Sequence, residues 1–174
     1  MALYRFGNRV PKVEKGSYVS DSARVIGDVT IGADCYIGHG AVLRGDYGSI
    51  LLGPGTAVEE NATIHIRPEG DSIIGERVTI GHGAVVHCNR IQDCAVIGMG
   101  AVLSFDVEIG EWAIIAEGSV VSAHTSIPSN KIAVGVPAQI TDDVQSDQKA
   151  FWSYVKDLYI DLAHRYPKEF EKIG

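Results

Sequence analysis

Large aromatic side chains, long apolar runs and clusters of positive charge are all scarce in this chain. Phe, Trp and Tyr make up 7% of its 174 residues, which argues against a core built on large rings. No segment approaches the roughly 18 uninterrupted apolar residues of a membrane-spanning helix. The formal net charge is −7 and Lys and Arg form no run, so the sequence disfavours nucleic acids and anionic membrane surfaces as partners.

Cysteine is also rare, and its pattern does not suggest a disulfide framework. Cys35, Cys88 and Cys94 are odd in number. The opening segment MALYRFGNRV lacks the apolar stretch of a signal peptide, so we expect a cytoplasmic protein. Cys35 and Cys94 occupy small-residue positions of the repeat described next, where packing accounts for them. Cys88 follows a candidate metal ligand, so a contact with that site stays open.

What the chain has instead is a six-residue phrase repeated along most of its length. The phrase begins with an aliphatic residue, often has Gly second, and has a small or β-branched residue fifth. A short period of this kind predicts a parallel β-solenoid in which three phrases close one coil and the first residue points inward. Nineteen phrases make about six coils, and they start at Val19, Val25, Ile31, Ile37, Leu43, Leu52, Val58, Ile64, Ile74, Ile80, Val86, Ile91, Ile97, Leu103, Ile109, Ile115, Val121, Ile127 and Ala133.

Two insertions interrupt the repeat. About three extra residues lie around YGSI, between Leu43 and Leu52, and about four lie around PEGD, between Ile64 and Ile74. Insertions in a solenoid are expected to protrude as loops on one side, where they often carry function.

The repeat ends near Pro137, and a different pattern follows. Apolar residues at 151, 154, 155, 158, 162 and 166 have the spacing of an amphipathic helix. One helix cannot bury its own apolar stripe, so we expect it to pack along the solenoid or on a neighbouring subunit. The predicted organisation is a β-helix with an N-terminal cap over residues 1–140 and a C-terminal α-helical segment over 141–174.

Counting phrases places the histidines relative to one another. Residues three phrases apart stack about 4.8 Å apart, so Arg44, His65 and His87 form a column on one edge. His82 belongs to the preceding phrase and lies on the adjacent face, out of reach of the other two in its own chain. Three imidazoles suit Zn²⁺ and leave a fourth position open. A site that takes His82 from a neighbouring chain would require a trimer.

Histidines on a solenoid also have simpler interpretations than a metal site. Outward-facing histidines on a solenoid can be solvated or can make ordinary interface contacts. Two of them stacked in register beside an insertion, with a third in the adjacent phrase, favour a metal site. His39, His124 and His164 have no such support and are expected to be surface or interface residues.

Several segments together resemble one protein family, the γ-class carbonic anhydrase-like hexapeptide proteins. These segments are AVLRGD, ENATIH, VTIGHGAVVHC, VIGMGAVL, VGVPAQI and YIDLAHRY, and the resemblance covers about residues 8 to 166. It implies a mainly β fold, a left-handed parallel β-helix with a C-terminal α-helix. It also implies a homotrimer with zinc at His65, His82 and His87 across the subunit boundary. Fe²⁺ or Co²⁺ would also suit imidazole ligands.

The resemblance also assigns roles to other residues. Arg44 and Asp46 fall on the family's Arg and Asp: the Arg would form an ion pair across the interface, and Asp46 would share that network or act on the substrate. Tyr159 matches a Tyr of the terminal helix that can face the metal. Two positions depart from the pattern, because Glu59 stands where a Gln is usual and Glu60 where an Asp is usual.

The function expected from the resemblance is reversible hydration of CO₂ to bicarbonate. Zinc would lower the pKa of its bound water to about 7, and the hydroxide would attack CO₂ while Glu59 orients it. The loop IRPEGD shows no clear proton carrier, so weak activity or a non-catalytic metal-binding trimer is the first alternative. A hexapeptide acyltransferase is the second, although such an enzyme needs only one His as general base.

Overall fold

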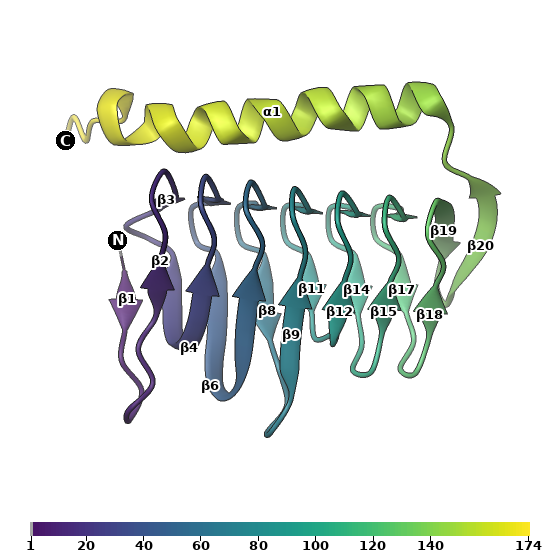
Figure 1. Cartoon of the computed structure of the whole chain (residues 1–174), viewed down its shortest axis with the longest axis horizontal. Coiled ribbons are helices and arrows are strands. Elements are labelled where there is room, and N and C mark those ends of the chain that lie inside the picture. Colours follow the sequence, from purple (N-terminus) through teal and green to yellow (C-terminus); the bar gives the residue numbers. More distant parts are fainter. Residues whose placement is uncertain (1) are drawn as a thin grey trace.

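The computed structural model describes residues 2–174, and these form a three-sided parallel β-solenoid with one long helix along its side (Figure 1). The prediction of a mainly β solenoid with a C-terminal helix is confirmed. The strands are β1 (Leu3–Tyr4), β2 (Lys12–Val13), β3 (Tyr18–Val19), β4 (Arg24–Ile31), β5 (Tyr36–Ile37), β6 (Val42–Leu52), β7 (Ala57–Val58), β8 (Thr63–His65), β9 (Asp71–Ile74), β10 (Thr79–Ile80), β11 (Val85–Val86), β12 (Arg90–Ile91), β13 (Val96–Ile97), β14 (Val102–Leu103), β15 (Glu108–Ile109), β16 (Ile114–Ile115), β17 (Val120–Val121), β18 (Ser126–Ile127), β19 (Lys131–Gly135) and β20 (Ala138–Asp143); the helix is α1 (Ser146–Glu169).

Strand pairing defines three faces of the prism. The helix face consists of β3, β5, β7, β10, β13, β16 and β19, and it ends in the antiparallel pair β19–β20. The valine face consists of the first part of β6 with β8, β11, β14 and β17, and we name it for its outward side chains, described below. The distal face consists of the last part of β6 with β9, β12, β15 and β18. The chain visits these faces in this order in every complete coil.

The core is a set of aliphatic ladders. All nineteen residues that begin a phrase are buried, and none of them is more than 3% exposed. Each ladder stacks one such residue on its equivalent in the next coil, as in the register Val58–Ile80–Ile97 on the helix face. Burying an aliphatic side chain of this size stabilises a fold by about 1.5–3 kcal/mol. Stacked Ile and Val side chains therefore fix the register of the coils and hold the corner residues in columns.

Two details differ from the sequence-based expectation. The helix face holds seven parallel strands, so the solenoid has about seven turns rather than six. The first insertion is not a separate loop but lies within β6, which runs without a break from one face to the next and absorbs the extra residues by a register shift opposite β4. Ile50, which follows the shift, is 1% exposed, so the side chains of β6 point into the core again from this residue. The second insertion projects from the row of coils between β8 and β9 (Figure 1).

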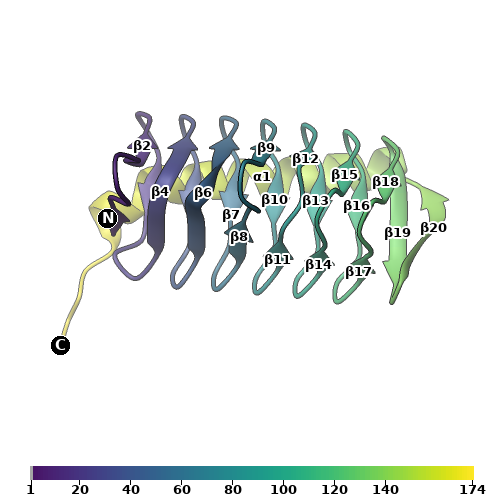
Figure 2. The same cartoon turned by 90° about the horizontal axis from the view of Figure 1, so that it is seen from below.

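Helix α1 lies along the helix face, parallel to the row of coils (Figures 1 and 2). Ala163 and Lys156 are its buried residues, at 1% exposed each. The predicted apolar stripe is only partly correct, because Phe151, Tyr154 and Leu158 are exposed in this single chain. Within residues 2–174, no helix has the length and apolar character needed to cross a membrane.

Candidate metal centre

The corner between the valine and distal faces brings together four of the predicted site residues. Arg44 pairs with His65 in the register of β6 and β8, and His87 follows β11 one coil further along. The distance from His87 Nε2 to His65 Nδ1 is 3.1 Å. Arg44 donates a hydrogen bond of 2.6 Å to Asp46, whose other carboxylate oxygen lies 3.4 Å from His65 Nε2. The predicted column of Arg44, His65 and His87 therefore exists, with Asp46 beside it.

Burial at this corner favours the neutral form of the His65 imidazole. The pKa of His65 is lowered by burial first, and then by the positive charges of Arg44 and of a protonated His87. His65 Nε2 and His87 Nδ1 are both buried without a hydrogen-bond partner. A neutral imidazole offers one nitrogen lone pair to a metal ion. The hydrogen bond between the two rings uses one of these lone pairs, so a zinc ion that replaced this hydrogen bond could take one ligand nitrogen from each ring.

The ion pair beside the rings is itself stabilised. Burial raises the pKa of Asp46, but the hydrogen bond and charge of Arg44 outweigh burial and hold that pKa below its ordinary value. Asp46 therefore carries a negative charge next to the two rings, and Arg44 balances it.

A second group lies at the corner between the helix and valine faces. His82 follows β10, and its ring lies between two carboxylates of the preceding coil. Its Nε2 is 3.1 Å from Glu59 Oε2, and its Nδ1 is 2.8 Å from Glu60 Oε2. Glu59 also accepts a hydrogen bond of 3.1 Å from the His82 backbone N–H. The corner holds His82 in a defined orientation, although the side chain is 46% exposed.

Glu59 and Tyr159 close this corner from the helix side. Glu59 is 5% exposed. Burial raises its pKa, and a hydrogen bond from Tyr159 and the charge of a protonated His82 oppose the rise. Burial also raises the pKa of Tyr159, as does the negative charge of Glu59. A cavity of about 210 Å³ opens here, with Glu59, His82 and Tyr159 in its wall beside Trp152 and Met99.

The structure thus places the seven predicted site residues in two groups. His65 and His87 lie at one edge of the valine face and His82 at the other, because β11 crosses that face between them. Within residues 2–174 of one protomer, no group of three or more His, Cys, Asp and Glu side chains is arranged to hold a metal. The three-histidine set can therefore form only if the two edges come from different chains.

Sequence reasoning did not predict the residue that anchors Glu60. The Tyr36 hydroxyl donates a hydrogen bond of 2.8 Å to Glu60 Oε1, and Tyr36 is 2% exposed beneath α1. The stacking register could have placed Tyr36 in the strand below Glu60, but no motif marks it. The open question about Cys88 is answered by its position, because its side chain is fully buried in the core rather than beside His87.

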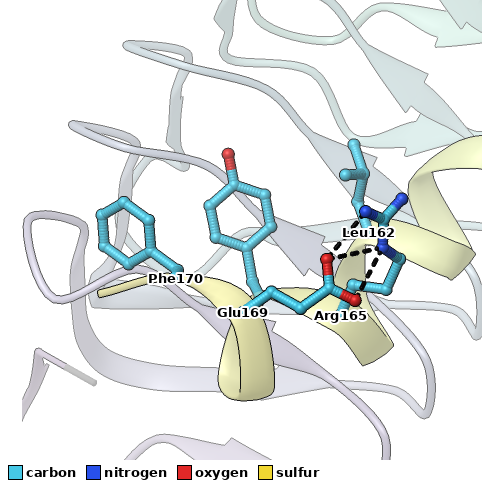
Figure 3. Close-up of a pocket in the computed structure, with 5 residues that line it drawn as sticks. Leu162, Arg165, Glu169 and Phe170 are labelled. Carbon is cyan, nitrogen blue, oxygen red and sulfur yellow. Dashed lines mark hydrogen bonds and ion pairs between the residues drawn. The ribbon is translucent and has the colours of Figure 1, made fainter.

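Another pocket, of about 170 Å³, lies at the C-terminal end of α1 (Figure 3). Its wall includes Leu162, Tyr166 and Phe170, and Arg165 forms an ion pair of 2.7 Å with Glu169 at its edge. None of the predicted site residues lines it.

Comparisons with known proteins give relatives along nearly the whole chain. The family profile described as bacterial transferase hexapeptide (six repeats) matches residues 11–45. Mitochondrial γ carbonic anhydrase 2 of Arabidopsis thaliana is 37% identical over 171 residues, which cover 95% of this chain and 62% of that protein. The chain therefore spans less than two thirds of the length of that relative and of the Arabidopsis γ carbonic anhydrase 1.

Two further relatives match along most of both chains. The carnitine operon protein CaiE of Salmonella agona is 37% identical over 166 residues, covering 95% of this chain and 83% of that protein. The crystal structure of a hexapeptide transferase family protein from Anaplasma phagocytophilum superposes with a TM-score of 0.90 at 31% identity. That match covers 95% of this chain and 98% of the other. The similarity extends through the solenoid and the helix together.

Proposed function

Because the chain belongs to the γ-class carbonic anhydrase-like hexapeptide-repeat family, we propose that it is a zinc-dependent enzyme that hydrates CO₂ reversibly to bicarbonate at sites shared between subunits of a trimer. One observation carries the proposal. Two imidazoles whose nitrogens face each other at 3.1 Å lie at one edge of the valine face, and His82 lies at the opposite edge.

The valine face supports the proposed trimer. Its outward row consists of β-branched residues in continuous register: Val42, Thr63, Val85, Val102 and Val120. A solvent-facing strand position is normally polar, and Val85 is 43% exposed in the protomer. Three copies that turn this face toward a common axis would cover the row. The same packing would bring the His82 edge of one copy to the His65 and His87 edge of the next.

Each residue near the site then has a defined task. Zinc, when bound, would act as a Lewis acid and make water nucleophilic near neutral pH. Glu59, whose Oε2 lies 3.1 Å from His82 Nε2, would accept a hydrogen bond from the attacking water and so orient it, and Tyr159 would hold the Glu59 carboxylate. The apolar wall of the adjoining cavity, which includes Trp152 and Met99, suits a small uncharged substrate such as CO₂.

Arg44 and Asp46 act on the ligands rather than on the substrate. Their ion pair of 2.6 Å lies beside His65, in the part of β6 where the register shift begins. Asp46 Oδ1 also keeps a negative charge 3.4 Å from the His65 ring. This charge favours electron donation from the imidazole to a metal ion.

The decisive experiment is stopped-flow CO₂ hydration by protein purified without oxygen and with its metal counted, beside His82→Ala. We expect about one metal per chain in the parent. Without His82, metal should be lost and kcat/KM should fall by more than about 100-fold, which exceeds the effect of losing an outer-sphere partner. His124→Ala is the matched control, because its side chain is 71% exposed and lies outside both groups.

The other outcomes are equally informative. Full metal content without turnover in the parent would indicate the non-catalytic trimer. Absence of bound metal after supplying Zn²⁺, Fe²⁺ or Co²⁺ would contradict the three-histidine site itself.

A further inference from the structure

His82 differs from the other two candidate ligands in how its ring is held. Both of its nitrogens contact carboxylates: Nε2 lies 3.1 Å from Glu59 and Nδ1 lies 2.8 Å from Glu60. Glu60 is also held from behind, because its other oxygen accepts the Tyr36 hydroxyl at 2.8 Å. A continuous chain of contacts therefore runs from Tyr36 through Glu60 to His82.

Tyr36 gives this chain a rigid base. It is 2% exposed, and its ring packs against Tyr18, Tyr159 and Tyr166 at centroid distances of 5.6, 5.3 and 5.5 Å. These rings come from β3, β5 and α1, so the solenoid and the helix both fix the phenol. An aromatic cluster of this kind leaves the hydroxyl little freedom to leave Glu60.

The solenoid register fixes the other end. Val58 pairs with Ile80, so Glu60 and His82, each two residues further on, occupy equivalent places in successive coils. Gly38 occupies the same turn in the coil before and makes room for Glu60. A Cβ at Gly38 would lie 2.7 Å from Glu60 Oε1 and 2.9 Å from the Glu60 backbone nitrogen. The turn is therefore built to accommodate this carboxylate.

A histidine that binds a metal through one nitrogen usually donates its other N–H to a carboxylate, which fixes the tautomer and the ring orientation. We propose that Glu60, anchored by Tyr36, is the positioning residue that keeps the Nδ1–H tautomer of His82 and turns Nε2 toward the metal. The inference rests on the proposed function in that Nε2 is taken as a zinc ligand. It assigns Glu59 and Glu60 different tasks, because Glu59 lies on the Nε2 side with the cavity and Glu60 lies behind the ring.

The test compares Glu60→Ala, Glu60→Gln and Tyr36→Phe for zinc affinity, measured by competition with a chelator on the trimeric protein. Glu60→Ala should weaken zinc binding by about 10- to 100-fold. Glu60→Gln keeps an acceptor oxygen without the charge, so it should restore part of that loss. Tyr36→Phe should weaken binding by a few-fold, and Tyr18→Phe, a neighbouring ring that donates no hydrogen bond to Glu60, should leave affinity unchanged.

A second measurement does not depend on bound metal. In metal-free Glu59→Ala, where Glu60 is the only carboxylate left against the ring, the ¹⁵N shifts of His82, assigned with His82→Ala, should report the Nδ1–H tautomer, and the double variant with Glu60→Ala should show a mixture of tautomers. If the parent binds zinc and Glu60→Ala binds it equally well with an unchanged tautomer, the positioning role is wrong. If the parent binds no metal, the proposed function fails, and the tautomer shift alone decides whether Glu60 orients His82. Equal melting temperatures across the variants exclude a loss of fold as the cause.

Discussion

At the scale of single residues, the direction of a side chain decides its chemistry, because neighbouring residues of a strand point to opposite sides. His87 and Cys88 continue this alternation just after the end of β11. His87 lies outward beside His65, while Cys88 is fully buried among the aliphatic ladders. Burial raises the pKa of the Cys88 thiol to about 12, so it stays protonated at neutral pH. A metal requires the thiolate, so Cys88 is a packing residue.

A prediction follows for Cys88. Cys88→Ala should leave the zinc content and CO₂ hydration unchanged and should lower the free energy of unfolding by about 1 kcal/mol, because it removes one buried apolar group. Metal analysis and urea denaturation measure the two effects. Loss of zinc in a variant that remains folded would show instead that the sulfur participates in the site.

The histidines and the anchoring residues differ in how far the sequence predicted them. Counting phrases was enough to place His65 and His87 in one column and His82 on another face. On each face, one buried aliphatic residue per coil stacks on its equivalent in the next coil, and this stacking sets the positions of the residues around it. Counting phrases could not indicate that Tyr36 reaches Glu60, because that contact depends on how α1 packs the aromatic rings.

At the scale of elements, α1 shows where periodicity fails. Its spacing correctly predicted a helix, but not which residues face the solenoid. The apolar residues Phe151, Tyr154 and Leu158 are exposed, whereas Lys156 is buried. The periodic pattern identifies the buried side of a helix from its apolar residues alone, so it could not predict that Lys156 is buried against the solenoid.

Lys156 is an unusual choice for a buried position. Its ammonium group donates hydrogen bonds to Thr79 Oγ1 at 3.0 Å and to the Ala95 carbonyl at 3.4 Å. It also lies 5.7 Å from the centre of the Trp152 ring. These contacts satisfy the group only partly, because burial lowers the pKa of Lys156 to about 8. The nearby charge of Arg77 lowers that pKa further, whereas Cys94 and Glu59 raise it.

This shift makes stability depend on pH. Between pH 8 and 10.5 the unfolded chain binds a proton at Lys156 that the folded chain does not, so the free energy of unfolding should rise with pH across this window. Below that window the folded protein carries a penalty of about 3 kcal/mol. Lys156→Met should therefore be more stable than the parent near pH 7, and the difference should shrink toward pH 10.

Urea denaturation at a fixed protein concentration, from pH 7 to 10, measures this difference. Lys149→Met is the matched control, because Lys149 lies on the same helix, less buried, over the Trp112 ring. Its stability should follow that of the parent across the range. A Lys156→Met curve parallel to that of the parent would contradict the buried-ammonium explanation.

At the scale of the whole molecule, the sequence predicted the solenoid because one aliphatic per phrase fills the core. It did not predict how the first insertion behaves, because β6 continues through it by a register shift that depends on pairing with β4. The proposed site would also require chains to associate. The two groups of site residues lie at opposite edges of the valine face, so an assembly that joins these edges completes the proposed site.

Subunit mixing tests that assembly directly. His82→Ala and His65→Ala should each give a trimer without zinc. A mixed trimer, however, contains one interface at which intact His65 and His87 from a His82→Ala chain meet intact His82 from a His65→Ala chain. Random mixing of equal amounts makes three quarters of the trimers mixed, each with one complete site of three, so about a quarter of all sites should recover.

Co-expression of the two variants with different tags, followed by selection for trimers carrying both, raises the expected recovery to about one site in three. Zinc content and CO₂ hydration should rise together, because both depend on the same complete interface. Mixing His65→Ala with His87→Ala is the control. Both changes lie at the same edge, so no interface regains all three histidines and recovery should be absent. Recovery in this control, or none in the first mixture despite trimer formation, would contradict a site built from opposite edges of two chains.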